Sequence, residues 1–303
     1  MTGDTSVGQG YCNGSCGEVV QGRRFDESSF HITCPIDLGT SVKVSLRPAA
    51  KQQFVHDPSL RRVAKMSQAA EVACQMLGLP PQRVELVSYE SELIPSRGMA
   101  SSTADVIAVA RAIAAARHTQ FTDEQMGALA ARVEHSTGVM YEGAVAFNQM
   151  TGELIERYEW SPRFAVIVIV PDDKLDVHAV SLSDDDRLVS KYEGLLQDYM
   201  DATQHRNASL VAAIATKAAS IHQQIIPNPL FAHYVNQLPR LGAAGIALAH
   251  TGSLIGLLYP AYRDGNIPHV VQETAERIAA SWPAATVKVT QTPTTKRLAA
   301  VAA

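Results

Sequence analysis

Strand-like and helical segments are mixed along this chain, and their order constrains the fold more than any other feature of the sequence. Strand character is found at residues 17–22, 30–36, 40–46, 84–91, 164–170 and 285–290. Helical spacing of apolar residues is found at 66–77, 101–117, 123–133, 188–204, 208–225 and 269–282. Because these segments do not alternate strictly, they favour an α+β fold over a doubly wound parallel sheet.

The length of 303 residues allows one large domain or two lobes that share a seam. The apolar run 164–170 is expected to begin a second lobe, which places the boundary between the lobes near residues 153–162. We therefore predict an N-terminal domain over 1–155 and a C-terminal domain over 156–303.

Composition and charge exclude several classes of protein. With 26 Lys+Arg against 30 Asp+Glu the net charge is −4, which argues against a nucleic-acid partner. No segment approaches the roughly 20 apolar residues of a membrane span, and the N-terminus lacks a signal-peptide pattern. The four cysteines suit reduced core thiols better than a zinc site. A cytoplasmic protein without a membrane partner is expected.

Residues 94–105 predict a binding site for an anion. A strand leads into a loop containing Gly98, and Ser101, Ser102 and Thr103 then open a helix whose unpaired N–H groups favour negative charge. Arg97 adds a fixed positive charge. An ordinary Ser-capped helix would read the same way, so the residues alone leave both interpretations open. The Gly-Lys-Ser/Thr of a Walker A loop is absent.

The segment 98–105, Gly-Met-Ala-Ser-Ser-Thr-Ala-Asp, resembles the ATP-phosphate loop of the GHMP kinases and, more narrowly, that of the L-threonine kinases of cobalamin synthesis. Three further stretches resemble signatures of the same branch, in the expected order: 15–22, 33–37 and 249–257. Four motifs spread over most of the chain are specific to the family.

The resemblance implies the two-lobed GHMP kinase fold, with a ribosomal-S5-like N-terminal domain and a ferredoxin-like C-terminal domain. It implies an ATP- and Mg²⁺-dependent kinase acting on the hydroxyl of a small amino acid, with L-threonine O-3-phosphate for cobalamin synthesis as the preferred product. Serine, homoserine or a specialised-metabolism analogue remain alternative acceptors, and a non-catalytic nucleotide- or metabolite-binding relative is a further alternative. The oligomeric state is left open, with a homodimer as one option.

The resemblance also assigns residues to roles. Those expected to hold the ATP phosphates are Arg97, Gly98, Met99, Ala100, Ser101, Ser102 and Thr103. Mg²⁺ would be bound by Ser102 and Glu134, and the expected catalytic residues are Ser102, Glu134, Thr137 and Glu142. The expected substrate-binding residues are Glu18, Asp37, Gly252 and Ser253. His250 is expected to be a core or rim histidine.

Several of these residues have simpler interpretations. Glu134 could be a solvated carboxylate at a helix end, and Glu18 could form an ion pair with Arg23 or Arg24. Asp105, which the branch shares, could be an exposed helix residue near the helix dipole.

The chain departs from the branch where a catalytic base is expected. The branch reads Glu-Pro-Thr-Asp at the metal site, and its Asp is the expected base, whereas this chain has Glu134-His-Ser-Thr137. Thr137 cannot act as a base at neutral pH. Glu142 could substitute, or no protein base is used because a loose transition state needs little early deprotonation. The loop proline is also displaced by one position, to Pro95.

Overall fold

A computed structural model of the chain describes residues 5–60, 62–172, 186–250, 253–261 and 267–293. The N-terminal half consists of β1 (Ser6–Arg23), β2 (Ser29–Pro48), β3 (Gln53–Val55), α1 (Val63–Met76), β4 (Gln82–Ser91), α2 (Ser101–Ala116), α3 (Asp123–Val133), the 3-10 helix η1 (Gly138–Met140), β5 (Val145–Phe147) and β6 (Leu154–Arg157). The C-terminal half consists of β7 (Phe164–Pro171), α4 (Asp186–Gln204), α5 (Ala208–His222), α6 (Pro229–Val235), α7 (Leu238–Leu241), β8 (Gly245–Leu248), β9 (Ile255–Pro260), α8 (His269–Ser281) and β10 (Ala285–Gln291).

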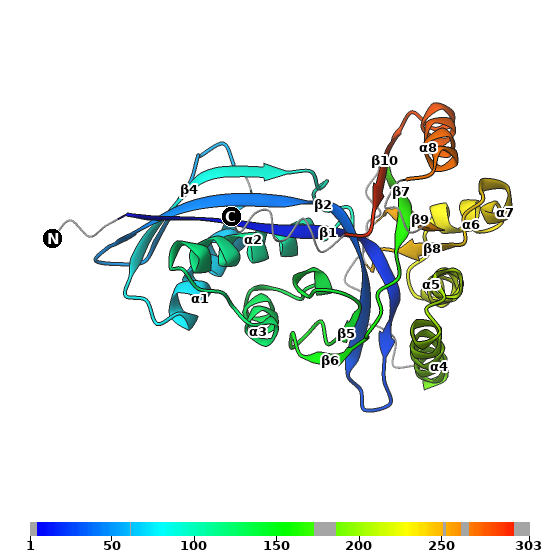
Figure 1. The fold of residues 1–303 in the computed structure, drawn as a ribbon, viewed down its shortest axis with the longest axis horizontal. Helices are drawn as coiled ribbons and strands as arrows, with labels where there is room; N and C mark the ends of the chain where they lie inside the picture. The colour runs from blue at the N-terminus through cyan, green and yellow to red at the C-terminus, as the bar shows by residue number, and fades with distance from the viewer. Residues whose placement is uncertain (1–4, 61, 173–185, 251–252, 262–266, 294–303) are drawn as a thin grey trace.

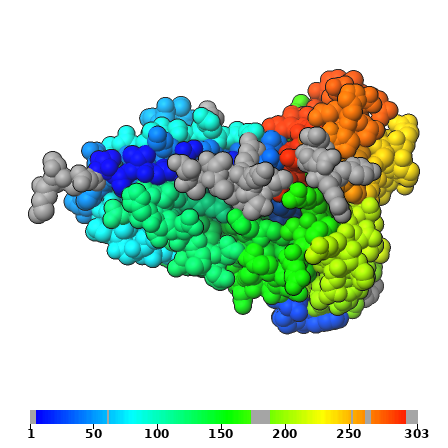
Figure 2. Space-filling view, viewed as in Figure 1, coloured from blue at the N-terminus to red at the C-terminus, as the bar shows by residue number. Residues whose placement is uncertain are grey.

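Within the described residues, one sheet runs through both halves in the order β10-β7-β9-β8-β1-β2-β4-β3, with β5 and β6 off this path. Helix α2 lies against the long strands β1 and β2, and α1 and α3 pack on α2; helices α4 to α8 lie on the side of β7 to β10 that faces away from the N-terminal half (Figure 1). The mixed fold is therefore α+β, as the irregular order of segments predicts. In the space-filling view the C-terminal colours gather at one end of the molecule (Figure 2).

The C-terminal lobe has the ferredoxin-like arrangement that was expected. Its strands and helices follow each other as β7, α4–α5, β8, β9, α8 and β10, and the strands are ordered β10-β7-β9-β8 with antiparallel pairing throughout. Strand β1 joins this lobe to the N-terminal sheet, because it pairs with β2 along its length and with β8 where Glu18 meets Leu248. Glu18 therefore lies at the junction of the lobes. The domain boundary after residue 155 stays a prediction.

Helix α2, which carries the phosphate-loop motif at its N-terminus, packs closely on β1 because both surfaces are made of small residues. A Cβ added at Gly10 would lie 2.1 Å from the carbonyl oxygen of Ala108, and one added at Gly8 would lie 2.1 Å from that of Ala112. The alanine-rich helix is itself buried along most of its length. Its start is thus held in a fixed position relative to the sheet.

Most of the expected segments are confirmed, with two informative differences. The helix predicted at 123–133 is found there, and Thr122 forms a capping box with Gln125. The segments 30–36 and 40–46 are parts of one strand, β2, and 17–22 is the end of the much longer β1. Irregularities in the β1–β2 register at Asn13, Ser15 and Glu18 interrupt the alternation of burial, which is why the sequence suggested shorter strands.

The four cysteines are buried and free, as expected for reduced core thiols. Among the helices in the described parts of the chain, none combines the length and the hydropathy needed to cross a lipid bilayer.

Candidate active site

The phosphate loop ends in a helix whose N-terminus has no side-chain cap. Gly98 and Ala100 both have positive φ, 93° and 57°, so the chain turns sharply before α2 begins. Ala100 occupies the N-cap position, and no side chain accepts a hydrogen bond from the first turn. The simpler interpretation as a Ser-capped helix is therefore wrong. The amides at the start of α2 remain available to an anion.

Two segments distant in sequence fix this loop. The amide of Ser15 in β1 donates to the Met99 carbonyl at 3.1 Å, and the amide of Leu254, in the β8–β9 connector, donates to the Arg97 carbonyl at 3.3 Å. Contacts from both lobes thus hold the turn in place, which reduces the reorganisation that ligand binding would need.

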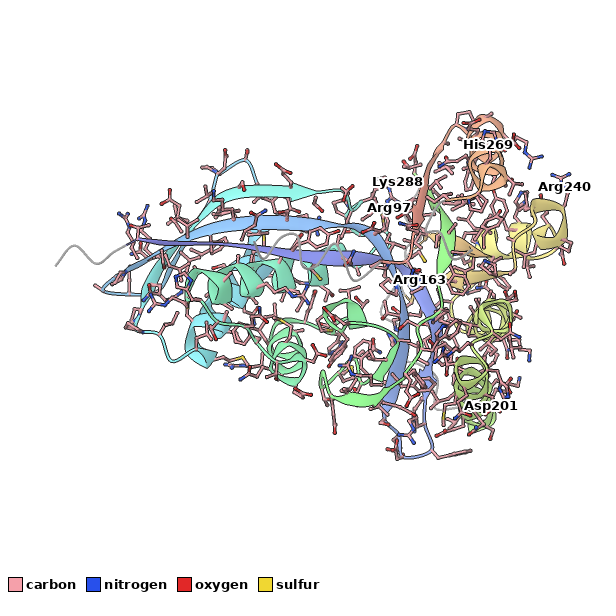
Figure 3. The ribbon with its side chains drawn as sticks, viewed as in Figure 1. Arg97, Arg163, Asp201, Arg240, His269 and Lys288 are labelled. Atoms are coloured by element: carbon pink, nitrogen blue, oxygen red, sulfur yellow. The ribbon has the colours of Figure 1, made fainter. Side chains whose placement is uncertain are left out.

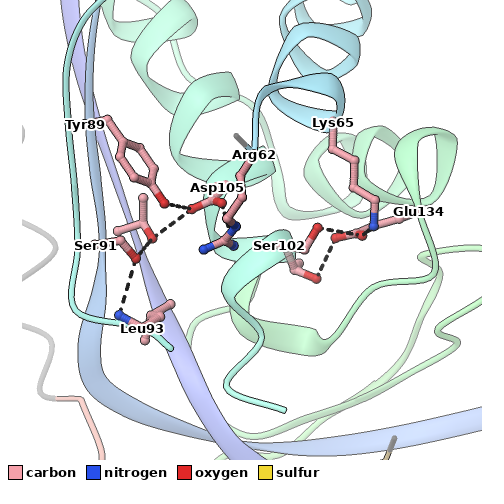
Figure 4. A network of polar contacts seen from close by, with 10 residues as sticks. Arg62, Lys65, Tyr89, Ser91, Leu93, Ser102, Asp105 and Glu134 are labelled. Carbon is pink, nitrogen blue, oxygen red and sulfur yellow. Dashed lines mark hydrogen bonds and ion pairs between the residues drawn. The ribbon is translucent and has the colours of Figure 1, made fainter. Parts of the chain in front are cut away.

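Glu134 lies opposite the start of α2 and receives its hydroxyl groups. Ser102 Oγ donates to Glu134 Oε2 at 2.8 Å, and Thr103 Oγ1 donates to Oε1 at 3.1 Å (Figure 4). The Lys65 ammonium group forms an ion pair with the same carboxylate. Since only 10% of the Glu134 side chain is exposed, its interpretation as a solvated helix-end carboxylate is wrong.

Asp105, one turn further along α2, is the centre of a second polar network. Its carboxylate pairs with Arg62 at 2.7 Å and accepts hydrogen bonds from Thr40 Oγ1 at 3.0 Å and Tyr89 Oη at 3.2 Å (Figure 4). Asp105 is buried, so it is not the exposed helix residue considered above. Burial raises the pKa of its carboxyl to about 6, although Arg62 and the two hydroxyl donors oppose the shift.

A cavity of about 420 Å³ opens over these groups. The residues predicted from the sequence that line it are Glu18, Gly98, Ala100, Ser101, Ser102, Thr103, Glu134 and Thr137. It also takes in Arg62, Lys65, Ser96, Asp105, His135 and His250. The cavity thus combines two cations and an uncapped helix N-terminus with carboxylates on its walls, a combination suited to an anion and a metal ion.

Glu18 stands among buried histidines. Its side chain is 1% exposed, and its Oε1 lies 3.8 Å from His31 Nδ1. The ring of His31 is 4.7 Å from that of His250, which in turn is 5.6 Å from that of His222. Burial raises the pKa of Glu18 to about 7, and a hydrogen bond from Thr33 opposes the shift.

The histidines are neutral at physiological pH. Burial lowers the pKa of His31 well below its usual value, and the neighbouring His250 and His222 add to the effect. Burial also lowers the pKa of His250 to about 4. These rings therefore offer Glu18 no full positive charge. The group beside its carboxylate is His31, and not Arg23 or Arg24 as the alternative interpretation expected.

Five of the predicted residues do not line this cavity: Arg97, Met99, Asp37, Glu142 and Ser253. Arg97 donates to the carbonyl of Asp172, and the Met99 side chain is fully buried, so these two would contribute through the backbone of the loop. Asp37 is half-buried and is not among the residues lining the cavity. Glu142 is exposed and also outside it.

Ser253 is buried and lines a different cavity, described below. Gly252 lies outside the described residues. Thr137, in contrast, faces the candidate site, and its buried Oγ1 has no hydrogen-bond partner among the described residues. It is free to orient a substrate group.

Sequence reasoning did not identify Arg62 and Lys65. Arg62 belongs to a dibasic pair that reads as solvated surface, and Lys65 lies on the first turn of α1 with nothing local to distinguish it. Only the packing of α1 beside α2 brings both side chains to the loop. His31 was also missed, because a single histidine in a strand carries no signal of its neighbours.

Comparison with known proteins agrees with this geometry. Residues 62–151 match the GHMP kinases N terminal domain. The chain is 24% identical over 290 residues to the L-threonine kinase of Salmonella typhimurium, covering 93% of each chain. It is 22% identical to the L-threonine kinase of Citrobacter freundii, covering 82% of this chain and 84% of that protein.

Solved structures of similar fold include a homoserine kinase from Cytophaga hutchinsonii, with a TM-score of 0.67 at 14% identity, covering 96% of this chain and 95% of the other. The L. major mevalonate kinase in complex with R-mevalonate has a TM-score of 0.66 at 18% identity and covers 96% of both chains. At such identities these two structures establish the fold only.

Proposed function

We propose that the chain is a phosphotransferase of the GHMP kinase type and that it transfers the γ-phosphoryl group of ATP to the side-chain hydroxyl of an amino acid, preferentially L-threonine. The observation that carries this proposal is the meeting of Ser102, Thr103 and Glu134 at an uncapped helix N-terminus, in a cavity that also contains a buried carboxylate, Glu18.

The phosphates of ATP would lie against the start of α2. The amides of the first helical turn point an array of donors at the phosphate oxygens, and Lys65 and Arg62 supply positive charge from α1 and the residue before it. Because phosphoryl transfer passes through a loose transition state, positioning and charge stabilisation account for most of the catalysis.

The residues present suit Mg²⁺. The hydroxyls of Ser102 and Thr103 and the carboxylate of Glu134 are the hard oxygen donors that this ion prefers. Mg²⁺ usually takes one or two protein carboxylates and completes its shell with water and phosphate oxygens. When bound, Mg²⁺ would neutralise charge on the transferring group.

Glu18 would recognise the α-ammonium group of the acceptor. A buried carboxylate beside neutral histidines has no cation of its own, so an ammonium group in the cavity would gain a charge-assisted hydrogen bond and hold Glu18 ionised. Thr137 would orient the acceptor through its free hydroxyl. No carboxylate base is required of this position, since the acceptor proton can leave late in the transfer.

Transfer from radiolabelled ATP to a panel of acceptors tests the proposal, with and without Mg²⁺. L-threonine, L-serine and L-homoserine are compared with 3-hydroxybutyrate, which has the hydroxyl and carboxylate of threonine but no amino group. We expect L-threonine to give the highest kcat/KM and 3-hydroxybutyrate almost none. Equal use of 3-hydroxybutyrate would refute an ammonium site.

Homoserine is the main competing acceptor, because a homoserine kinase shares this fold. A higher kcat/KM for L-homoserine would show that homoserine, and not threonine, is the preferred acceptor. The proposal of a hydroxy amino acid kinase would still stand. If L-threonine is preferred, its O-3-phosphate would supply the aminopropanol arm of cobalamin, and neighbouring genes for cobalamin synthesis would support that setting.

A further inference from the structure

A second and larger cavity, of about 710 Å³, lies in the C-terminal lobe between α6, α7 and α8. It is also lined by Pro171, at the end of β7, and by the buried Ser253, in the β8–β9 connector. No described residue lines both this cavity and the one at the phosphate loop. The volume falls within the usual range for sites that bind small molecules.

The walls of this cavity are apolar and partly aromatic. They are formed by Leu230, Tyr234, Leu241, Ile278 and Trp282. Four of these five side chains are otherwise packed into the core of the lobe, so the surface they present is held in shape by the fold. Such a surface favours the apolar body of a ligand.

The charge at the rim of the cavity is positive. Arg240 and Arg277 line it, and its described lining contains no Asp or Glu, although the chain as a whole has a net charge of −4. Both guanidinium groups have neutral partners among the described residues: Arg277 donates to Thr274 Oγ1 at 3.0 Å, and Arg240 donates to Gln237 Oε1 at 3.4 Å. Two arginines without a carboxylate partner match a carboxylate or phosphate.

A buried hydroxyl without a partner belongs to the lining of this cavity. Ser253 is 2% exposed, and its Oγ has no hydrogen-bond partner among the described residues. The neighbouring Asn228 is already used, since its Oδ1 caps α6 and its Nδ2 donates to the Ser253 carbonyl at 3.4 Å. A buried polar atom left unsatisfied in the wall of a cavity needs an explanation, and a bound polar ligand provides one.

We propose that this cavity is a second binding site, separate from the phosphate loop, for a small amphipathic anion: an apolar body against Tyr234 and Trp282, with a carboxylate or phosphate at Arg240 and Arg277. A cation would meet two like charges here, and a fully polar ligand would leave the apolar walls without contacts.

The site is linked to the phosphate loop through the β8–β9 connector. Ser253 lines the second cavity, and the amide of the next residue, Leu254, donates to the Arg97 carbonyl in the loop. Arg97 lies at the junction of the lobes, whereas Arg240 lies at the outer end of the C-terminal lobe (Figure 3). A ligand that shifts Ser253 therefore changes the geometry of the loop, and the KM for ATP changes with it.

Binding is tested with octanoate as the anionic probe and octyltrimethylammonium as a cationic control of equal chain length. The chain has two tryptophans, of which Trp282 lines the cavity, so the full-length Trp160→Phe protein reports on this site by fluorescence. We expect octanoate to give a saturable change in Trp282 emission and the cationic probe to give none.

Three variants locate the anion. Arg277→Gln and Arg240→Gln should each weaken octanoate binding about tenfold or more, the loss expected for one charge-assisted hydrogen bond. Arg163→Gln, an exposed arginine outside the cavity, should leave the affinity unchanged. Equal binding of both probes, unchanged affinity in Arg277→Gln and Arg240→Gln, or no saturable signal would overturn the site.

The coupling between the second cavity and the phosphate loop is measured separately, by the KM for ATP. In the wild-type protein, saturating octanoate should change the KM for ATP at least about twofold, and the change should disappear in Arg277→Gln. An unchanged KM despite saturable binding would contradict the link while leaving the binding site supported. Neither result depends on which amino acid accepts the phosphoryl group.

Discussion

At the scale of single residues, Glu134 and the hydroxyl of Ser102 lie side by side in the cavity. Their direct contact of 2.8 Å means that each substitution removes part of one shared arrangement. Ser102→Ala and Glu134→Gln should each lower kcat by about 100-fold or more, and the double variant should lose little more than either alone. Glu153→Gln is the matched control, because it makes the same Glu-to-Gln change at an exposed residue outside the cavity. Fully additive losses would show that the two groups act independently.

Glu18 should give the protein a recognisable dependence of stability on pH. Burial raises its folded-state pKa to about 7 from the ordinary value of 4.5, so the carboxyl binds its proton more tightly in the folded state. Its contribution to stability is complete below the lower value and is lost as pH rises through the higher one. Glu18→Gln should therefore gain in Tm relative to the wild type between about pH 5 and about pH 8.

Thermal unfolding at both pH values measures this difference. Glu153→Gln controls for the general effect of removing one negative charge, and its Tm difference from the wild type should be the same at both pH values. A Glu18→Gln difference that did not change with pH would mean that Glu18 does not titrate in this range.

Residue-level prediction from sequence is most direct where the residues of a site are contiguous. The turn at Gly98 and the hydroxyls that follow it form one continuous segment, so their chemistry can be read directly. Arg62, Lys65 and His31 reach the cavity only through packing between elements far apart in the sequence, and no short pattern reveals such a position. Glu142 was proposed as a substitute base from its nearness in sequence to Thr137, yet its side chain is exposed outside the cavity.

At the scale of elements, the position of α2 depends on its close approach to β1. Gly10→Ala would place a methyl group 2.1 Å from the Ala108 carbonyl oxygen, so the helix must move or the strand must bend. We expect a loss of about 1–3 kcal/mol in the free energy of unfolding, together with a higher KM for ATP because the loop at the start of α2 is displaced. Urea denaturation and steady-state kinetics measure the two effects.

Gly194→Ala is the matched control for this substitution. Gly194 lies within α4, and a Cβ there would meet nothing within 4 Å. Alanine should leave stability unchanged or raise it by about 0.5–1 kcal/mol, because it favours the helix more than glycine does. A similar loss at both glycines would show that the close approach of α2 to β1 is not what makes Gly10 necessary.

Element-level prediction was best for α3, where Thr122 and Gln125 supply both halves of the cap within four residues. It was poorest for β1 and β2. Their register irregularities shift which residues face the core, so the alternation that reveals a strand breaks part of the way along. The α+β class followed from the order of segments, whereas the specific two-lobed fold followed only from the family motifs.

At the scale of the whole molecule, the cavity exists because both lobes meet at the phosphate loop. ATP that binds there links α1, α2 and the loop, so it should stabilise the folded chain against heat. The rise in Tm on adding ATP and Mg²⁺ should be smaller in Lys65→Gln, which lacks the ammonium group beside Glu134. Lys217→Gln, at an exposed ion pair with Asp198, should show the wild-type rise. An equal rise in both variants would exclude Lys65 from the nucleotide site.

The central claim is that the loop at 98–103 holds ATP for transfer to the hydroxyl of an amino acid. Phosphorus NMR of the wild-type protein incubated with ATP, Mg²⁺ and L-threonine tests it most directly, because it identifies the bond that forms. We predict a new phosphomonoester resonance that coincides with added L-threonine O-3-phosphate and grows about 100-fold more slowly with Ser102→Ala. Conversion of ATP to inorganic phosphate alone, across all hydroxy amino acids offered, would contradict the claim.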